Sequence, residues 1–375
     1  MDGHARSNPV LVVRVPRGVS RLCSVAVVHR IELRSDNAAG VAPEVMRAAV
    51  DANDGSAMAY GGDDLTLRLH DTVASTFGAD HVSVWPVSTG TAANSLALAA
   101  MCPPWGSVLC HESAHILRNE GGATSMFSGG AVMRGVAGAH ARIDPVALSG
   151  AIAEITPGDP HHSQPRVLSL TCPSDMGTVY SPAEIGVLAA IASAHTMRVH
   201  LDGARLANAI VANGCTPADL TTAAGLHAFS LGSIKNGGMS ADAIVCLDPS
   251  LDEELLYRTK RAGHVASKMR FASAQLVAHL HGGLWLRLAE RANAAMAVLS
   301  EGLASHGCEF LETPAANMAF VRADTALADA LEATGLDFYR ITDQVIRFVT
   351  SWQTTDDDAR EAVSRWARAV ESVSR

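Results

Sequence analysis

The sequence predicts an α/β protein built on a mostly parallel β-sheet, followed by a smaller C-terminal α+β unit. Short apolar runs without alternation recur over the first 250 residues, as in strands that are covered on both faces. Helical patterns lie between several of these runs, and the chain becomes mostly helical beyond about residue 255. With 375 residues, 48% of them hydrophobic, the chain is long enough for two lobes with sizeable cores.

The elements follow from these patterns in order. The expected strands of the main sheet lie at 81–88, 107–112, 166–172, 198–202, 226–231 and 243–247. The expected helices around them lie at 43–53, 65–78, 91–101, 182–196 and 205–214. Pro43 suits the first turn of its helix and Gly78 the end of the next one. The smaller unit has an expected helix at 288–307, expected strands at 308–314, 318–324 and 345–352, and two further helices.

These patterns divide the chain into a large domain at 31–280 and a small domain at 281–375, after an N-terminal extension at 1–30. The extension is apolar but is interrupted by arginines and Pro16, and it lacks a small-residue cleavage site. We therefore expect a disordered leader or a misassigned start, with an extra strand as the alternative, and not a secretory signal.

Composition excludes several classes of protein. The formal charge of −9 is spread without acidic or basic blocks, so we expect neither nucleic acid nor a charged membrane as a partner. No apolar run approaches the roughly 20 residues that span a bilayer. The seven cysteines show no metal-ligand spacing, so we expect no metal site and reduced thiols in a cytoplasmic protein.

The turn after the first expected strand of the main sheet is a candidate anion site. Thr89, Gly90 and Thr91 place hydroxyls and unpaired backbone N–H groups at the start of a helix, where they can hold a phosphate. The turn has neither GxGxxG nor GxxxxGK[ST], which argues against a dinucleotide or a nucleoside triphosphate. Taken alone, this turn is as readily explained as an ordinary connection between a strand and a helix.

Two more strand ends carry charged residues. The run at 198–202 finishes on Asp202, and burying a carboxylate without a cationic partner is costly. Arg205 or a bound cofactor could supply that partner. Lys235 follows another strand among glycines, where a desolvated amine can form a Schiff base, although an isolated lysine is usually solvated. The phosphate-binding turn, the aspartate and the lysine together match the needs of pyridoxal phosphate, with Asp202 on the pyridine nitrogen.

Ten motifs, taken in order, resemble the L-threonine aldolase family, in the β-eliminating-lyase branch of fold-type I pyridoxal-phosphate enzymes. The resemblance runs from about Ile31 to the C-terminus, and the variant looks like the bacterial low-specificity subgroup. It implies a seven-stranded sheet in the large domain. The motifs are IELRSDN, YGGDD, STGTAANSLAL, HESAHILRNEGGA, QPRVLSLT, GTVYSPAEI, HLDGARLANA, GSIKNGG, SKMRFASAQ and IRFVTSW.

The resemblance assigns roles to residues at matching positions. Lys235 is implied as the Schiff-base lysine, Asp202 as the pyridine partner and Arg205 as a cofactor contact. The turn Thr89-Gly90-Thr91 is implied in phosphate binding, and Arg270 is expected near the phosphate. His115 matches a histidine that stacks on the cofactor ring; its alternative is a histidine of the core.

The remaining positions concern the substrate. Ser35 and Arg347 match the residues that hold its carboxylate, and the apolar flanks of Arg347 indicate a buried strand rather than a surface arginine. His161, or else His162, matches a second active-site histidine; the alternative is a solvated loop histidine. Many relatives have a glutamate in the segment before GTVY, where this chain has TCPSDMGT. Asp175 is the candidate to replace that glutamate, and the difference leaves the substrate range open.

The implied reaction is aldol cleavage of a β-hydroxy-α-amino acid to glycine and an aldehyde, with His115, His161 or a water as the base. β-Elimination and transaldolation are alternatives with the same cofactor, and a phosphate-ligand binding protein is an alternative without it. The resemblance also implies a homo-oligomer, commonly a tetramer built as a dimer of dimers. The segments around Tyr60 and Arg270 are then expected to reach the neighbouring subunit's site.

Overall fold

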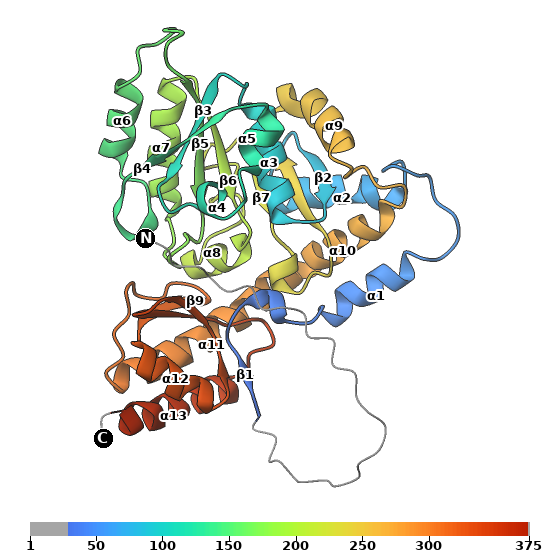
Figure 1. Ribbon diagram of the computed structural model, residues 1–375. Coiled ribbons are helices and arrows are strands. Elements are labelled where there is room, and N and C mark those ends of the chain that lie inside the picture. Colours follow the sequence, from blue (N-terminus) through green and yellow to red (C-terminus); the bar gives the residue numbers. More distant parts are fainter. Residues whose placement is uncertain (1–28, 374–375) are drawn as a thin grey trace, which may run out of the picture.

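The computed structural model describes residues 29–373, arranged as two lobes (Figure 1), so the expectation for residues 1–28 falls outside the described residues. The large lobe contains a seven-stranded sheet in the order β2-β8-β7-β6-β5-β3-β4. Only β8 runs antiparallel to its neighbours. The strands are β2 (Ser83–Val87), β3 (Gly106–His111), β4 (Val132–Val136), β5 (Gln164–Thr171), β6 (Arg198–Asp202), β7 (Ala228–Leu231) and β8 (Asp242–Cys246). The α/β fold with a mostly parallel sheet is therefore confirmed.

Helices cover both faces of this sheet, as the buried strand pattern predicts. Pro43 lies in the first turn of α1, and Gly78 ends α2 in the left-handed conformation, with φ of 61°. Helix α3 is buried on nearly all sides, which explains its run of alanine and leucine. The helices are α1 (Pro43–Asp51), α2 (Asp64–Phe77), α3 (Gly90–Met101), α4 (His115–Arg118), α5 (Ala123–Ser128), α6 (Pro145–Ala153), α7 (Pro182–Ala194), α8 (Leu206–Asn213), α9 (Asp252–Arg261) and α10 (Arg270–Leu280).

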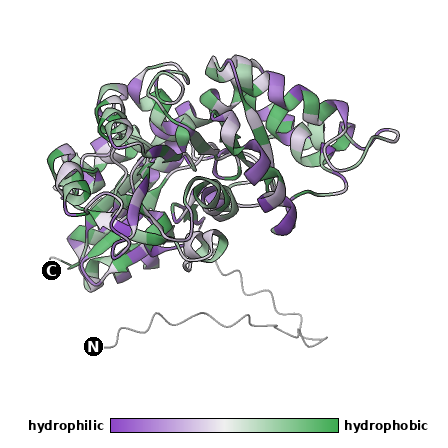
Figure 2. Cartoon of the chain, turned by 90° about the horizontal axis from the view of Figure 1, so that it is seen from above, coloured by the Kyte–Doolittle hydropathy of each residue, from purple (hydrophilic) through white to green (hydrophobic). Residues whose placement is uncertain are grey.

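The small lobe packs three helices against a three-stranded sheet in the order β11-β12-β9. Hydrophilic and hydrophobic residues alternate along the outer helices of the molecule (Figure 2), as expected of helices with one buried side. The segment expected as a strand at 308–314 forms only an isolated bridge, between Phe310 and Val321. The elements are α11 (Leu284–Ser305), β9 (Met318–Arg322), α12 (Thr325–Ala333), β10 (Leu336–Asp337), β11 (Tyr339–Thr342), β12 (Val345–Val349) and α13 (Asp356–Val373).

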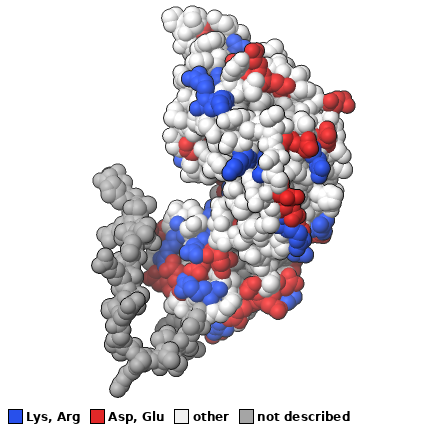
Figure 3. Space-filling view, turned by 90° about the vertical axis from the view of Figure 1, so that its right-hand side faces the viewer, with Lys and Arg blue, Asp and Glu red and all other residues white. Residues whose placement is uncertain are grey.

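The charged surface agrees with the composition. Basic and acidic side chains are interspersed on the face in Figure 3, with no extended region of one sign. Within residues 29–373 no helix is long and apolar enough to cross a membrane. The same residues contain no group of three or more His, Cys, Asp or Glu side chains placed to hold a metal ion.

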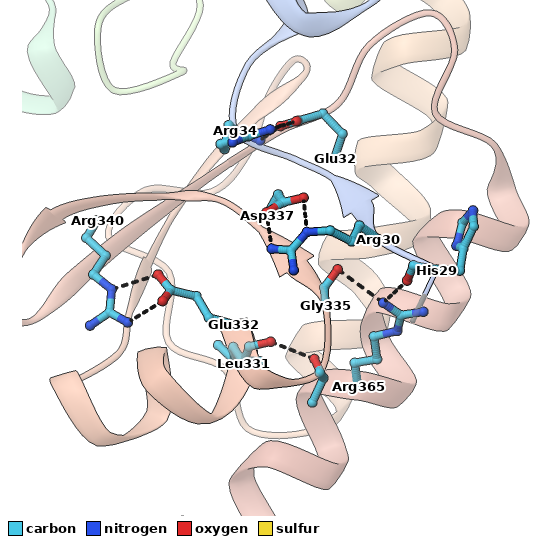
Figure 4. Close-up of polar contacts among 11 residues, drawn as sticks. His29, Arg30, Glu32, Arg34, Leu331, Glu332, Gly335, Asp337, Arg340 and Arg365 are labelled. Carbon is cyan, nitrogen blue, oxygen red and sulfur yellow. Dashed lines mark hydrogen bonds and ion pairs between the residues drawn. The ribbon is translucent and has the colours of Figure 1, made fainter. Parts of the chain in front are cut away.

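The first described strand belongs to the small lobe, although the sequence places residue 31 in the large domain. Strand β1 (Ile31–Glu32) pairs in parallel with β10, and Ile31 and Leu33 are buried in the small-lobe core. Figure 4 shows how Arg30 pairs with Asp337 and how Arg365 donates to backbone oxygens on both sides of this contact. Residues 31–33 therefore pack with the small lobe, although the sequence assigned them to the large domain.

Candidate active site

The segments that follow β6 and β7 meet at the carboxyl edge of the main sheet, where open α/β sheets bind ligands. The N–H of Gly232 donates to the carbonyl oxygen of Gly203 over 3.2 Å. A Cβ at Gly232 would lie 2.2 Å from the carbonyl oxygen of Ala204, so only glycine permits this approach. The two glycines bring the segment of Asp202 next to the segment of Lys235.

A pocket of about 560 Å³ opens at this edge, between the two lobes. Six of the residues expected from the sequence line it: Ser35, His115, Asp202, Arg205, Lys235 and Arg347. Residues of the small lobe, among them Met318, Phe320 and Tyr339, form part of its wall. The structure therefore gathers most of the predicted site residues in one cavity.

The carboxylate of Asp202 is buried, and only one of its oxygens is used. The backbone N–H of Ala204 and the hydroxyl of Ser230 donate to Oδ1, over 3.1 and 3.4 Å. Oδ2 has no hydrogen-bond donor among residues 29–373. Asp202 lines the pocket, and a free oxygen on such a largely buried carboxylate fits a cationic ligand group, such as a protonated pyridine nitrogen.

Arg205 does not pair with Asp202, so this alternative from the sequence is wrong. Its Nε and Nη2 donate to the two oxygens of Asp36, over 2.6 and 2.8 Å. Asp36, at the start of the 3-10 turn η1 (Asp36–Ala38), is 1% exposed. Burial alone would raise the pKa of Asp36, but the charge and hydrogen bonds of Arg205 outweigh burial and hold this pKa below its usual value.

Asp36 is a site residue that sequence reasoning missed, although it follows Ser35 in the quoted motif. Asn317, at the start of the small-lobe strand β9, donates to Asp36 over 3.1 Å and to the carbonyl oxygen of Thr350 over 2.8 Å. The pair of Asp36 and Arg205 thus joins the small lobe to the edge of the main sheet. The sequence signal for Asp36 was weak, since its partner lies 169 positions away.

Lys235 lies in the 3-10 turn η3 (Ile234–Asn236) with no ion pair among the described residues. Burial and the charge of Arg205 lower the pKa of its amine, which favours the neutral form that attacks a carbonyl. Asp242 holds the preceding turn by accepting the N–H groups of Ser233 and Ile234, over 2.7 and 3.1 Å. Asp242 is a second supporting residue that the sequence did not reveal.

The turn Thr89–Thr91, which was expected to bind a phosphate, does not line the pocket. Thr89 caps α3 by accepting the N–H of Ala92, which leaves the N–H groups of Gly90 and Thr91 without helical partners. A Cβ at Gly90 would lie 3.7 Å from Asp242 Oδ2, so the turn adjoins the residue that supports Lys235. Burial raises the pKa of Asp242 and so disfavours a negative charge on this carboxyl group, which would repel a phosphate at the neighbouring turn.

His115 begins α4 at the pocket wall. Its backbone N–H donates to Asp175 Oδ2 over 3.0 Å, and its Nδ1 lies 3.8 Å from Asp175 Oδ1. Burial lowers the pKa of the imidazole and so favours its neutral form. Glu120 follows this helix in the chain and accepts a hydrogen bond from Asn94 over 3.0 Å, and burial raises its pKa to about 8.

His161 and Arg270 are also outside the pocket lining within one chain. His161 is exposed in the turn before β5, at the opposite edge of the sheet, where its N–H donates to Asp159. Its neighbour His162 is also exposed. Arg270 begins α10 and donates to the carbonyl oxygen of Gly55 over 3.3 Å, while its buried Nε has no hydrogen-bond partner. A catalytic His161 and a cofactor contact from Arg270 therefore have no support inside the single chain.

We expect Asp36→Asn to lower the free energy of unfolding by about 3 to 5 kcal/mol, because Arg205 keeps its buried charge without a carboxylate. Urea unfolding of the cofactor-free protein measures this loss. Asp337→Asn is the matched control: it breaks an Arg–Asp pair whose arginine side chain is 58% exposed, and should cost about 0 to 1 kcal/mol. Equal losses in the two variants would contradict a special role for the buried pair.

Known proteins resemble this chain in sequence and in fold. The low specificity L-threonine aldolase of Pseudomonas aeruginosa is 37% identical over 335 residues, which cover 89% of this chain and 96% of that protein. A threonine aldolase structure from Leishmania major shares the fold with a TM-score of 0.84 at 23% identity, covering 90% of this chain and 99% of that one. A serine palmitoyltransferase from Sphingomonas wittichii shares it with a TM-score of 0.69 at 15% identity, covering 92% and 88%. A family model described as beta-eliminating lyase matches residues 32–326, and the chain belongs to this family.

Proposed function

We propose that the protein is a pyridoxal-phosphate-dependent lyase that cleaves L-threonine, L-allo-threonine or related β-hydroxy-α-amino acids to glycine and an aldehyde. The observation that carries the proposal is one pocket that holds a desolvated lysine, a buried carboxylate with an unused oxygen and an arginine. The relatives named low specificity L-threonine aldolase support the choice of substrate.

The chain offers a group for each part of the cofactor. The amine of Lys235 would hold it covalently, Oδ2 of Asp202 would accept from the protonated pyridine nitrogen, and the turn at Thr89–Thr91 would bind the phosphate. His115 would lie against the ring. When bound, pyridoxal phosphate supplies an electron sink for the pair that remains on the substrate Cα.

Arg347 and Ser35 are the proposed carboxylate site of the substrate. Two hydrogen bonds join the segment before Ser35 to β12: the backbone N–H of Val349 donates to the carbonyl oxygen of Leu33, and Nη2 of Arg347 donates to that of Arg34. Ser35 and Arg347 both line the pocket. The buried Nε of Arg347 has no hydrogen-bond partner, and burial lowers the pKa of its guanidinium. Such an arginine favours an anion that accepts two parallel hydrogen bonds, as a carboxylate does.

The decisive assay incubates the holoenzyme with L-threonine. We expect equal amounts of acetaldehyde and glycine, no product from Lys235→Ala, and a pyridoxyl group on Lys235 in peptides mapped after borohydride reduction. Ammonia and a keto acid would instead indicate β-elimination, and products that require a second aldehyde would indicate transaldolation. A protein that takes up no cofactor would fit a phosphate-ligand binding protein.

We expect Arg347→Lys to raise KM for L-threonine at least about tenfold, because lysine cannot make the paired hydrogen bonds of a guanidinium. Cofactor binding, followed by its visible absorption, should change much less. Arg340→Lys, in an exposed pair with Asp329 on the same small lobe, is the control. An unchanged KM in Arg347→Lys would place the substrate carboxylate elsewhere.

We further propose a cytoplasmic homo-oligomer, a tetramer arranged as a dimer of dimers. The segment between α1 and α2 forms an extended loop away from the large lobe (Figure 1), and its Met58 and Tyr60 are 73% and 60% exposed. Large apolar side chains on a projecting loop favour burial against another subunit. The unused Nε of Arg270 lies next to the same loop, through Gly55.

Light scattering at micromolar concentration should give the mass of a tetramer. Replacing Met58 and Tyr60 together by serine should shift the population toward smaller species and lower the activity, because Arg270 would no longer reach its expected site. A fully active wild-type monomer would overturn the shared-site proposal and leave the cofactor assignment untouched.

A further inference from the structure

We propose that Asp175 is the catalytic base that takes the proton from the β-hydroxyl group of the substrate. The inference rests on the proposed function and names a residue for a step that the sequence left to His115, His161 or a water. Asp175 stands in the loop that leaves the carboxyl end of β5, and it lines the pocket together with Lys235 and Arg347.

The position of the carboxylate is fixed, and one oxygen is available. Oδ2 accepts the backbone N–H of His115 over 3.0 Å, which ties the loop to the start of α4. Oδ1 lies 3.8 Å from His115 Nδ1, too far for a hydrogen bond. The side chain is 22% exposed, so it is held by the protein but still open to the pocket.

Charged groups from several elements set the proton affinity of Asp175. Burial is the largest influence and raises its pKa to about 7, and the negative charge of Asp202 acts in the same direction. The N–H of His115 and the charges of Arg205 and Lys235 lower it. The other titratable groups that face it are Arg347 and Cys110. A base whose pKa lies near the working pH is partly deprotonated, so it can accept a proton, and it is basic enough to take that proton from a reacting group.

The other candidates are less suitable. Burial lowers the pKa of His115, and its Nδ1 faces Asp175 and Asn119 instead of standing free. Asp202 is the proposed partner of the pyridine nitrogen. Glu120 is bonded to Asn94 and does not line the pocket. His161 lies at the opposite edge of the sheet.

The step balances without any further reactant. The β-hydroxyl O–H bond breaks, and its proton passes to Oδ1 of Asp175. The electron pair of that bond becomes the second bond of the aldehyde carbonyl, while the Cα–Cβ bond breaks and leaves its pair on Cα. A proton then replaces the lost carbon at Cα, so glycine and the aldehyde together contain all atoms of the substrate.

The test compares Asp175→Asn with the wild-type holoenzyme in two reactions. Asparagine can still accept the N–H of His115 but cannot take a proton. We expect cleavage of L-threonine to fall at least about 10²-fold, the usual scale of general-base catalysis. The exchange of the glycine Cα proton with deuterated water, which involves no β-hydroxyl, should stay within about threefold. Asp175→Glu should recover part of the cleavage.

The pH dependence and the cofactor-free protein give independent measurements. The base must be deprotonated, so wild-type kcat/KM should rise through an apparent pKa near 7, and Asp175→Asn should lack this limb. Infrared difference spectra of the cofactor-free protein, wild type minus Asp175→Asn, should show one carboxylic acid band that titrates near pH 7, because the contributions of Glu120 and Asp242 are common to both proteins and cancel. Asp324→Asn is the control: its carboxylate also accepts one backbone N–H, from Leu327, but far from the pocket.

Two results would overturn the assignment while leaving the proposed function intact. Equal losses of cleavage and glycine exchange would mean that Asp175 acts through the fold or the cofactor. Full cleavage by Asp175→Asn, with an unchanged pH limb, would move the base to another group. A wild-type holoenzyme that exchanges glycine but cleaves no β-hydroxy-α-amino acid would refute the proposed function itself.

Discussion

The buried pair of Arg205 and Asp36 is the contact on which the arrangement of the site depends. Arg205 precedes α8 in the large lobe, Asp36 lies in the N-terminal segment, and Asn317 reaches the same carboxylate from the small lobe. A charge taken out of water needs such a partner, so the three segments cannot separate without a large electrostatic cost. Because Arg205 is paired with Asp36, it does not neutralise Asp202. The carboxylate of Asp202 therefore remains in the pocket for a cationic ligand atom.

The sequence predicted the parts of the site that depend on local pattern. Asp202 ends one short apolar strand and Lys235 comes shortly after another. The carboxyl ends of parallel strands lie on the same side of the sheet, so the meeting of the two residues follows from secondary structure alone. Ser35 and His115 have no such local signal, and the apolar flanks of Arg347 indicate a buried strand but not its place in the site. They were predicted from the family resemblance, and the structure places all three in the pocket lining.

Other features could not be predicted, for identifiable reasons. Strand β4 lies at the sheet edge with several residues partly exposed, so it lacks the apolar run that marks the central strands. The two-residue β1 depends on a partner about 300 positions away. Whether Arg205 pairs with Asp202 or with Asp36 depends on the direction of its side chain, which cannot be read from the spacing of residues in the sequence. His161 and Arg270 match family motifs. A motif does not show at which end of the strands a side chain lies, or to which subunit's site it contributes.

The pairing of β1 with β10 also imposes an order on biosynthesis. Ile31 and Leu33 leave the ribosome early, yet the strand that covers them arrives only with residues 336–337. At about 5 to 20 residues per second, roughly 15 to 60 s of translation separate the two partners. The strands of the main sheet are complete by Cys246, so the large lobe has its β-framework while the small lobe still lacks most of its chain. The small lobe, and with it the wall of the pocket that carries Arg347, is therefore the last part of the enzyme to form.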